Sequence, residues 1–168
     1  MKALVTGGGG FLGLAIVKML RQRGDTVRTF SRHEHRALRE LGVEQVAGDI
    51  GDLESVTKAA DGCDIVFHVA AKAGVWGPYE DYHRANVLGT EHVIAACRDH
   101  DIQRLVYTSS PSVVFNGRDM EGVNESVPYP DHFEAHYPHT KAIAEQRVLA
   151  ANGAKLATVA LRPHLIWG

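Results

Sequence analysis

The feature that most constrains the fold is a run of four glycines near the N-terminus. An apolar run ends at Val5, Thr6 and the glycines follow, and a helical pattern begins at Phe11. Within this stretch Gly7, Gly10 and Gly13 have the spacing of a dinucleotide-binding fingerprint. A flexible glycine-rich turn is the alternative, and the strand before and the helix after the glycines favour the binding motif.

Each glycine has a separate physical role in such a motif. The first makes the sharp turn, the second lets the backbone approach a pyrophosphate, and the third lets the helix pack closely against the strand. Free amide N–H groups and the positive end of the helix dipole then face the phosphates. The predicted cofactor site therefore includes Gly7, Gly10, Phe11, Leu12 and Gly13.

Composition narrows the class of protein. The 168 residues are enough for one domain with a sizeable core. A net charge of -2 and a pI near 6.5 give no basic surface for nucleic acid. Cys63 and Cys97 are too few for a disulfide framework and suggest buried thiols in a reducing compartment. Because no apolar run could span a bilayer, we expect no membrane segment and a cytoplasmic protein.

Strand-like and helical segments alternate along the chain. The strand-like ones lie at 3–5, 26–30, 43–47, 64–69, 103–108 and 156–161. Helical periodicity covers 11–23, part of 31–41, 52–60 with Asp52 as its cap, 79–100 and 137–151. This order predicts an α/β fold with a doubly wound parallel sheet, a Rossmann fold, and a ligand along the carboxyl ends of the strands.

The second chemical signal is the segment from Tyr137 to Lys141. Residues four apart share one face of a helix, so the phenol and the ammonium can point into one site. Pro138 fits only the first turn of a helix, which puts Tyr137 at the helix entrance. A nearby ammonium lowers the pKa of a phenol from about 10. The alternative is an ordinary helix surface; the position after the fifth strand favours the functional interpretation.

Hydroxyl groups follow the fifth strand at Thr108, Ser109 and Ser110. Ligands of doubly wound folds bind at this end of the strands, where a hydroxyl can bind a substrate oxygen. A serine turn that satisfies its own backbone is the alternative, and considered alone it is the better interpretation.

Together these segments resemble the extended branch of the short-chain dehydrogenase/reductase family. The matching motifs appear in the family's order: 6–13, 48–50, 68–71, 86–90, 108–110, Tyr137 with Lys141, and 162–163. Within the family, the serines after the fifth strand and the loop 72–78 are most similar to 3-beta-hydroxysteroid dehydrogenases. They are equally similar to bacterial 2-alkyl-3-oxoalkanoate reductases.

The resemblance implies four catalytic residues. Tyr137 passes a proton to or from the substrate oxygen, and Lys141 holds the nicotinamide ribose and lowers the tyrosine pKa. Ser110, with Ser109 as the alternative, orients the substrate oxygen. Asn86 supports the site from the helix predicted over 79–100.

The resemblance also implies further cofactor contacts. Asp49 and Ile50 would flank the adenine, and residues 70–72 (Ala70, Ala71 and Lys72) would pass under the ribose and phosphates. Lys141 would hold the nicotinamide ribose, and Pro163 would lie beside the nicotinamide.

Cofactor preference is argued from the residues after the second strand. An NAD site usually has an acid there for the ribose 2′-hydroxyl. Here Ser31 and Arg32 follow, and the first acid is Glu34. Because a guanidinium suits a 2′-phosphate, we predict NADP(H), with NAD possible and a solvated arginine as the alternative.

Two other groups of residues are weighed for function. His132, His136 and His139 have ligand-like spacing, but they lie in a loop without a cysteine, so we predict solvated histidines and no metal. Trp76 and Tyr79 could line a substrate pocket or a partner surface, and could equally anchor a loop.

The leading hypothesis is an enzyme, an NAD(P)-dependent oxidoreductase. It moves hydride between nicotinamide and a hydroxyl or ketone carbon of a sterol-like or long-chain 3-oxoacyl substrate. The alternatives are a nucleotide-sugar epimerase of the same family and a non-catalytic dinucleotide-binding regulator. The small-molecule substrate is the expected partner. A homodimer through the helices predicted over 79–100 and 137–151 is possible. Residues 1–168 are expected to be one NAD(P)-binding Rossmann domain, truncated before most of the substrate-binding region, that binds dinucleotide and turns over poorly.

Overall fold

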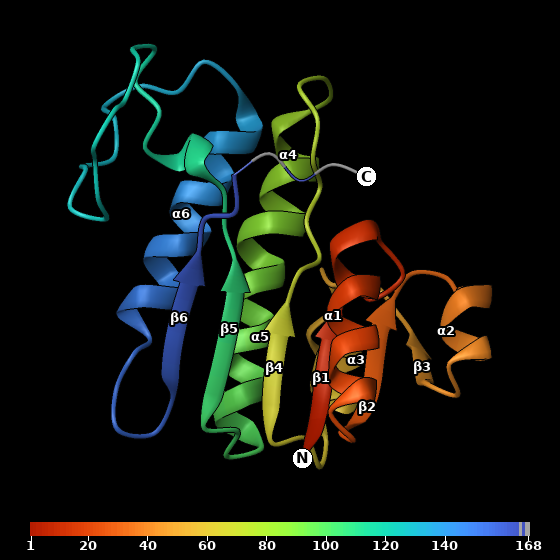
Figure 1. Ribbon diagram of the computed structural model, residues 1–168. Helices are drawn as coiled ribbons and strands as arrows, with labels where there is room; N and C mark the ends of the chain where they lie inside the picture. The colour runs from red at the N-terminus through yellow and green to blue at the C-terminus, as the bar shows by residue number, and fades with distance from the viewer. Residues whose placement is uncertain (165, 167–168) are drawn as a thin grey trace.

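The sheet is parallel throughout. A computed structural model describes residues 1–164 and 166, and its strands lie in the order β3-β2-β1-β4-β5-β6 (Figure 1). The strands are β1 (Lys2–Thr6), β2 (Thr26–Ser31), β3 (Glu44–Ala47), β4 (Ile65–His68), β5 (Arg104–Thr108) and β6 (Ala157–Leu161). This order is that of the Rossmann fold and confirms the predicted fold class. The predicted domain range extends over residues 165, 167 and 168, which lie outside the described residues.

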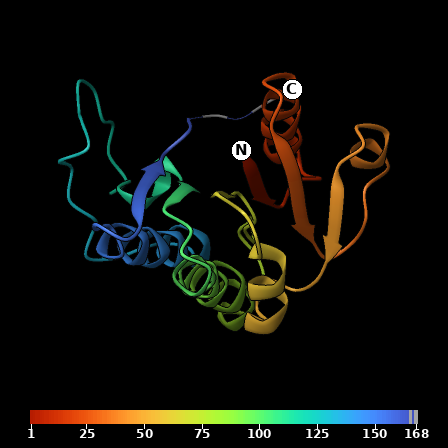
Figure 2. The same ribbon diagram turned by 90° about the horizontal axis from the view of Figure 1, so that it is seen from below.

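Helices cover both faces of the sheet. They are α1 (Phe11–Gln22), α2 (Arg36–Glu40), α3 (Leu53–Ala60), α4 (Tyr79–Tyr82), α5 (Gly89–Asp99) and α6 (His136–Ala150). Helices α3, α5 and α6 lie on one face, and α1 lies on the other (Figure 2). Among the described residues, no helix has both the length and the apolar character needed to cross a membrane.

Strand β1 explains why both faces need helices. Its residues alternate between two apolar clusters: Ala3 and Val5 pack with Val17 of α1, and Leu4 packs on the opposite face with α3 and α5. The sheet therefore has a core on each side, as expected for parallel strands.

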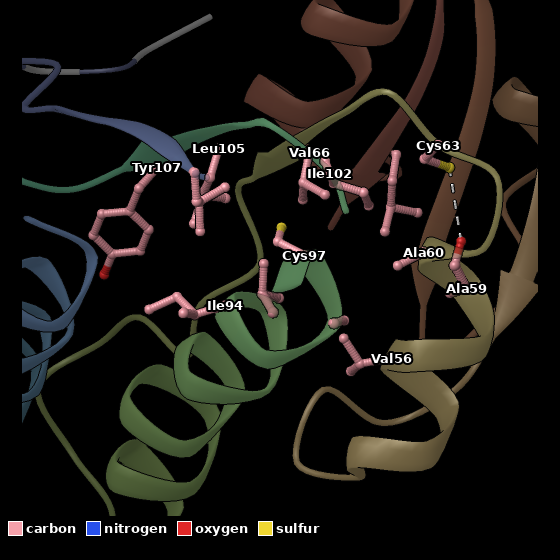
Figure 3. Close-up of a cluster of buried hydrophobic side chains, with 14 of the residues drawn as sticks. Val56, Ala59, Ala60, Cys63, Val66, Ile94, Cys97, Ile102, Leu105 and Tyr107 are labelled. Atoms are coloured by element: carbon pink, nitrogen blue, oxygen red, sulfur yellow. Dashed lines mark hydrogen bonds between the residues drawn. The ribbon is translucent and has the colours of Figure 1, made fainter. Parts of the chain in front are cut away.

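The second of these clusters contains both cysteines. Figure 3 shows Val56 of α3, Ile94 and Cys97 of α5 and Leu105 of β5 converging between the helices and the sheet. Cys63 and Cys97 are free and buried, as predicted. Burial raises the pKa of Cys97 to about 12, so this thiol is an unreactive core group.

The connection between β1 and α1 depends on the absence of side chains. Gly7 has φ +68, and its backbone lies against Ala70 at the end of β4. A Cβ atom at Gly13 would overlap the carbonyl oxygen of Gly7. These are the roles of turn and close packing that the sequence predicts for the two glycines.

The predicted helix over 79–100 is not uniform. Helix α4 passes into a π-helical segment, His83–Leu88, before α5 begins at Gly89. The long helix predicted from the sequence is present, but the sequence did not indicate the π-helical segment, because periodicity does not register a single extra residue in one turn. Asn86 lies inside the π-helical segment.

Replacing Gly13 by Ala tests the packing of α1 on the turn. The neighbouring atoms are backbone and cannot rotate away, so we expect Gly13→Ala to lose about 1–3 kcal/mol of unfolding free energy. The matched control is Gly153→Ala, whose Cβ would meet nothing within 4 Å. Urea denaturation of both variants measures the difference. Equal stability of the two would contradict the close packing.

Candidate active site

A cavity of about 650 Å³ opens where β1, β2, β3 and β4 end. This volume lies within the range of small-molecule sites. Of the 14 residues predicted for the cofactor, 12 line it: Gly7, Gly10, Phe11, Leu12, Gly13, Ser31, Arg32, Asp49, Ile50, Ala70, Ala71 and Lys72. Lys141 and Pro163 are not among the lining residues.

The glycine turn has the features that a diphosphate requires. The N–H of Gly10 donates to the carbonyl of Gly7 at 3.0 Å, closing the turn. Gly10 then precedes α1 without a side-chain cap, so the first amides of α1 have no partner inside the helix. Unpaired amides at the positive end of a helix bind anions. The turn therefore fits a dinucleotide.

A buried chain of hydrogen bonds joins β1 to β4 beside this turn. The Thr6 hydroxyl accepts the N–H groups of Val69 and Ala70, each at 3.1 Å, and contacts Nδ1 of His68 at 2.7 Å. Since both lone pairs of Thr6 are used, its proton goes to Nδ1. Nε2 of His68 then donates to Thr90 at 3.0 Å.

This chain requires a neutral His68. Burial, and secondarily the charge of Lys141, lowers the pKa of His68 to about 3. The histidine is thus a fixed hydrogen-bond bridge. The sequence motif 68–71 includes His68, but the sequence analysis assigned this residue no role.

Asn86 holds two parts of the site together. It is buried, its Oδ1 accepts the Lys72 N–H at 2.8 Å, and its Nδ2 donates to the Lys72 carbonyl at 3.1 Å. Nδ2 also donates to Thr140 of α6 at 3.0 Å. Asn86 therefore fixes the loop after β4 against the first turns of α6.

Tyr137 lies in the first turn of α6, next to the end of β5. Burial raises the pKa of Tyr137, and the adjacent Ser110 hydroxyl acts in the opposite direction. Ser110 also accepts the N–H of Ser112 at 3.2 Å, so the local serine turn exists as well. Ser109, the alternative, is buried with its hydroxyl beside Glu145.

Lys141 is buried and bound to the protein backbone. Its Nζ donates to the Thr108 carbonyl at 2.6 Å and lies 4.1 Å from the ring centroid of Tyr107. Burial lowers the pKa of Lys141 to about 7, and the carboxylate of Glu145 opposes this shift. The sequence predicted that Lys141 lowers the pKa of Tyr137. The structure has the pKa of Tyr137 raised, because desolvation of the phenol dominates.

A buried ion pair supports this end of the site and was missed by sequence analysis. Glu145, one turn after Lys141, accepts from Nη2 of Arg162 at 2.5 Å and from the Tyr129 hydroxyl at 2.6 Å. Arg162 is the residue before Pro163. These contacts therefore hold the segment after β6 against α6 and against the irregular loop between β5 and α6, which carries Tyr129.

The opposite end of the cavity carries charged side chains, some of which the sequence did not indicate. Arg32 is exposed, and the Ser31 hydroxyl donates to the His33 carbonyl at 2.8 Å. Asp49 accepts from the Gly51 N–H at 2.8 Å and pairs with Arg84 at 2.8 Å. Arg84 comes from the π-helical segment, so only the fold brings it here.

The three histidines considered as ligands lie apart from any metal-like group. His136 and His139 pack around the ring of Tyr79, with centroids 5.5 and 5.9 Å away. Among residues 1–164 and 166, no His, Cys, Asp or Glu side chains cluster as metal ligands would. Trp76, in contrast with Tyr79, is 88% exposed.

The sheet order, the glycine turn and the Tyr137 helix define a Rossmann-type protein of the short-chain dehydrogenase/reductase superfamily. Residues 4–168 match the sequence profile of the 3-beta hydroxysteroid dehydrogenase/isomerase family. The chain belongs to this family.

Curated relatives carry oxidoreductase names. The chain is 58% identical over 170 residues to the 2-alkyl-3-oxoalkanoate reductase of Stenotrophomonas maltophilia, covering 100% of this chain and 52% of that protein. It is 41% identical over 175 residues to a 3 beta-hydroxysteroid dehydrogenase/Delta 5-->4-isomerase of Mycobacterium tuberculosis, covering 99% and 47%. The chain thus spans about half the length of these relatives.

Solved structures with the same fold contain NAD. MoeE5 in complex with UDP-glucose and NAD aligns with a TM-score of 0.83 and 33% identity, over 96% of this chain and 54% of that one. The UDP-glucose 4-epimerase of Thermus thermophilus in complex with NAD aligns with a TM-score of 0.82 and 31% identity, over the same shares, 96% and 54%.

The neutral state of His68 predicts a pH-dependent stability. Its pKa is about 3 when folded and about 6.5 when unfolded, so the unfolded state binds more protons between these values. The contribution of His68 to the unfolding free energy should therefore fall by about 2 kcal/mol from pH 7.5 to pH 5. Denaturation at both pH values measures this loss.

His68→Gln is the control for this pH dependence. Glutamine can accept from Thr6 and donate to Thr90 but does not titrate, so the variant should lose most of the slope. A slope that persists in the variant would assign the effect to other groups.

Proposed function

We propose that this chain binds NADP(H) and provides the proton-transfer residues of an oxidoreductase. The reaction moves hydride between the nicotinamide and a hydroxyl or ketone carbon, and Tyr137 exchanges the proton with the substrate oxygen. The substrate class is a sterol-like or long-chain 3-oxoacyl compound. Residues 1–168 act as one dinucleotide-binding unit in this proposal.

The observation that carries the proposal is the position of Tyr137. It lies beside Ser110 at the end of β5, on the same edge of the sheet as the glycine turn. In a parallel sheet this edge is where ligands bind. A phenol, a hydroxyl and the predicted diphosphate site thus share one side of the molecule.

The chain's own residues suit delivery of a proton. Because burial raises the pKa of Tyr137, the phenol is protonated at neutral pH and can donate to an oxygen that becomes negatively charged. Ser110 provides a second hydroxyl for the same oxygen. The bound nicotinamide supplies the hydride chemistry.

Lys141, in its protonated form, places a positive charge at the end of β5, where its Nζ donates to the Thr108 carbonyl. The nearby Glu145 carboxylate opposes the effect of burial on the pKa of Lys141, and the ammonium also lies over the face of Tyr107. A cation here favours negative charge that develops on the phenol oxygen during proton transfer. Asn86 fixes the helix that carries both residues.

The relatives favour a reductase over an epimerase. The curated relatives at 58% and 41% identity are named as a reductase and a dehydrogenase. The epimerase structure is similar at 31% identity. We therefore keep nucleotide-sugar epimerisation as the second candidate function and a cofactor-binding regulator without catalysis as the third.

Replacing Tyr137 by Phe tests the proton-transfer role. General acid catalysis contributes about 10²- to 10⁴-fold, so the turnover of full-length Tyr137→Phe should fall by at least about 100-fold. The dissociation constant for NADPH should stay within about twofold, because the change removes one oxygen. Turnover near that of the wild type would refute the assignment.

A substrate panel separates the candidate functions. NADPH oxidation is measured with a 2-alkyl-3-oxoalkanoate and a 3-ketosteroid, and epimerisation is measured with UDP-glucose. Activity on UDP-glucose alone would replace the oxidoreductase with the epimerase. Binding of dinucleotide without turnover of any compound would favour the regulator.

Arg32→Ala tests the cofactor preference. Loss of a guanidinium from a 2′-phosphate should weaken NADPH binding by about 10-fold or more and change NADH binding by no more than about twofold. Arg36→Ala is the matched control, since Arg36 is exposed and pairs with Glu40 at 2.7 Å. Calorimetric titration measures both ligands. An unchanged preference in Arg32→Ala would remove Arg32 from the site.

The homodimer and the cytoplasmic location stay predictions. Helices α5 and α6 lie side by side on one face of the sheet, where the proposed dimer contact would form (Figure 2). Sedimentation of the purified protein measures the oligomeric state.

A further inference from the structure

We propose that His35 is a specificity-determining residue that binds the 2′-phosphate of NADP(H) together with Arg32. This inference rests on the proposed function, since it requires that the cavity binds a dinucleotide. It adds a residue that the sequence analysis did not select and that none of the comparisons points to.

The imidazole of His35 lies directly against the glycine turn. A Cβ atom at Gly9 would overlap the His35 ring, so the ring occupies space that the missing side chain leaves open. The backbone N–H of His35 donates to Oε1 of Gln45 at 2.7 Å. His35 is half-buried and lines the cavity. It is therefore part of a preformed wall.

The carboxylates near this wall are already paired. Glu34, the acid closest in sequence, pairs with Arg39 at 2.7 Å and does not line the cavity. Asp49 and Asp81, which do line it, pair with a cation each, Arg84 at 2.8 Å and Lys72 at 3.3 Å.

The basic side chains after β2 have no such partner. In the part of the chain that the structure describes, Arg32, His33 and His35 form no ion pair. This end of the cavity therefore has positive charge, and donor groups, that no protein carboxylate compensates.

A ligand with an additional phosphate would compensate this uncompensated positive charge. NADP(H) differs from NAD(H) by the 2′-phosphate, and a ribose 2′-hydroxyl would instead call for a free carboxylate. Ser31 is a weaker candidate as a second donor, because its proton is bound to the His33 carbonyl at 2.8 Å. His35 is the remaining donor that the backbone and Gly9 hold in place. The planar guanidinium of Arg32 would make one contact with the 2′-phosphate, and the imidazole of His35 would make the second.

Binding of paired ligands tests the role of His35. The titrations use the 168-residue chain with NADPH, NADH, adenosine 2′,5′-bisphosphate and ADP. We expect His35→Phe, which keeps a flat ring over Gly9 but has no donor, to weaken NADPH and the 2′,5′-bisphosphate by about 10-fold. NADH and ADP should change by no more than about twofold. His35→Gln, which keeps a donor, should lie between wild type and His35→Phe.

The control is His132→Phe, an exposed histidine in the irregular loop, which should bind all four ligands as the wild type does. Equal weakening of NADPH and NADH in His35→Phe would make His35 a structural wall only and overturn the inference. Retention of the full NADPH preference in His35→Phe would also overturn it, while leaving the proposed function intact. Failure of the wild-type chain to bind any dinucleotide would overturn the proposed function and, with it, this inference.

Discussion

The site depends on one hydroxyl group, that of Thr6. At the point where β1 and β4 end, the chain turns to opposite faces of the sheet, and the backbone N–H groups of Val69 and Ala70 no longer have a strand partner. The Thr6 oxygen accepts both of them, at 3.1 Å each. Buried N–H groups without partners are costly, so a single side chain lets the crevice open between neighbouring strands. His68, Thr90 and then Asn86 extend the same network toward α6.

Much of the fold follows from the local sequence. Six apolar strand segments, the glycine turn and the Asp52 cap of α3 were predicted from the chain and are confirmed. Of the 14 residues predicted for the cofactor, 12 lie together around the cavity, because they follow the strands directly and the carboxyl ends of parallel strands meet at one edge. Such positions are fixed by chain order and topology alone.

The remaining features depend on contacts between distant segments. Arg84 pairs with Asp49 across 35 positions of sequence, and Glu145 binds Arg162 only after α6 and β6 have packed. Burial raises the pKa of Tyr137, which the sequence did not indicate, since spacing on a helix says nothing about how deeply a phenol is buried. Local patterns encode which residues share a face; burial and charge pairing come from the assembled molecule.

The π-helical segment has a consequence for how the molecule tolerates change. One additional residue in a turn rotates everything that follows by about 100° about the helix axis. Asn86 contacts Lys72 and Thr140 from within this segment, and Thr90, which follows it, contacts His68. Deleting one residue between His83 and Leu88 would turn Thr90 by about 100° about the helix axis and so move its hydroxyl away from His68.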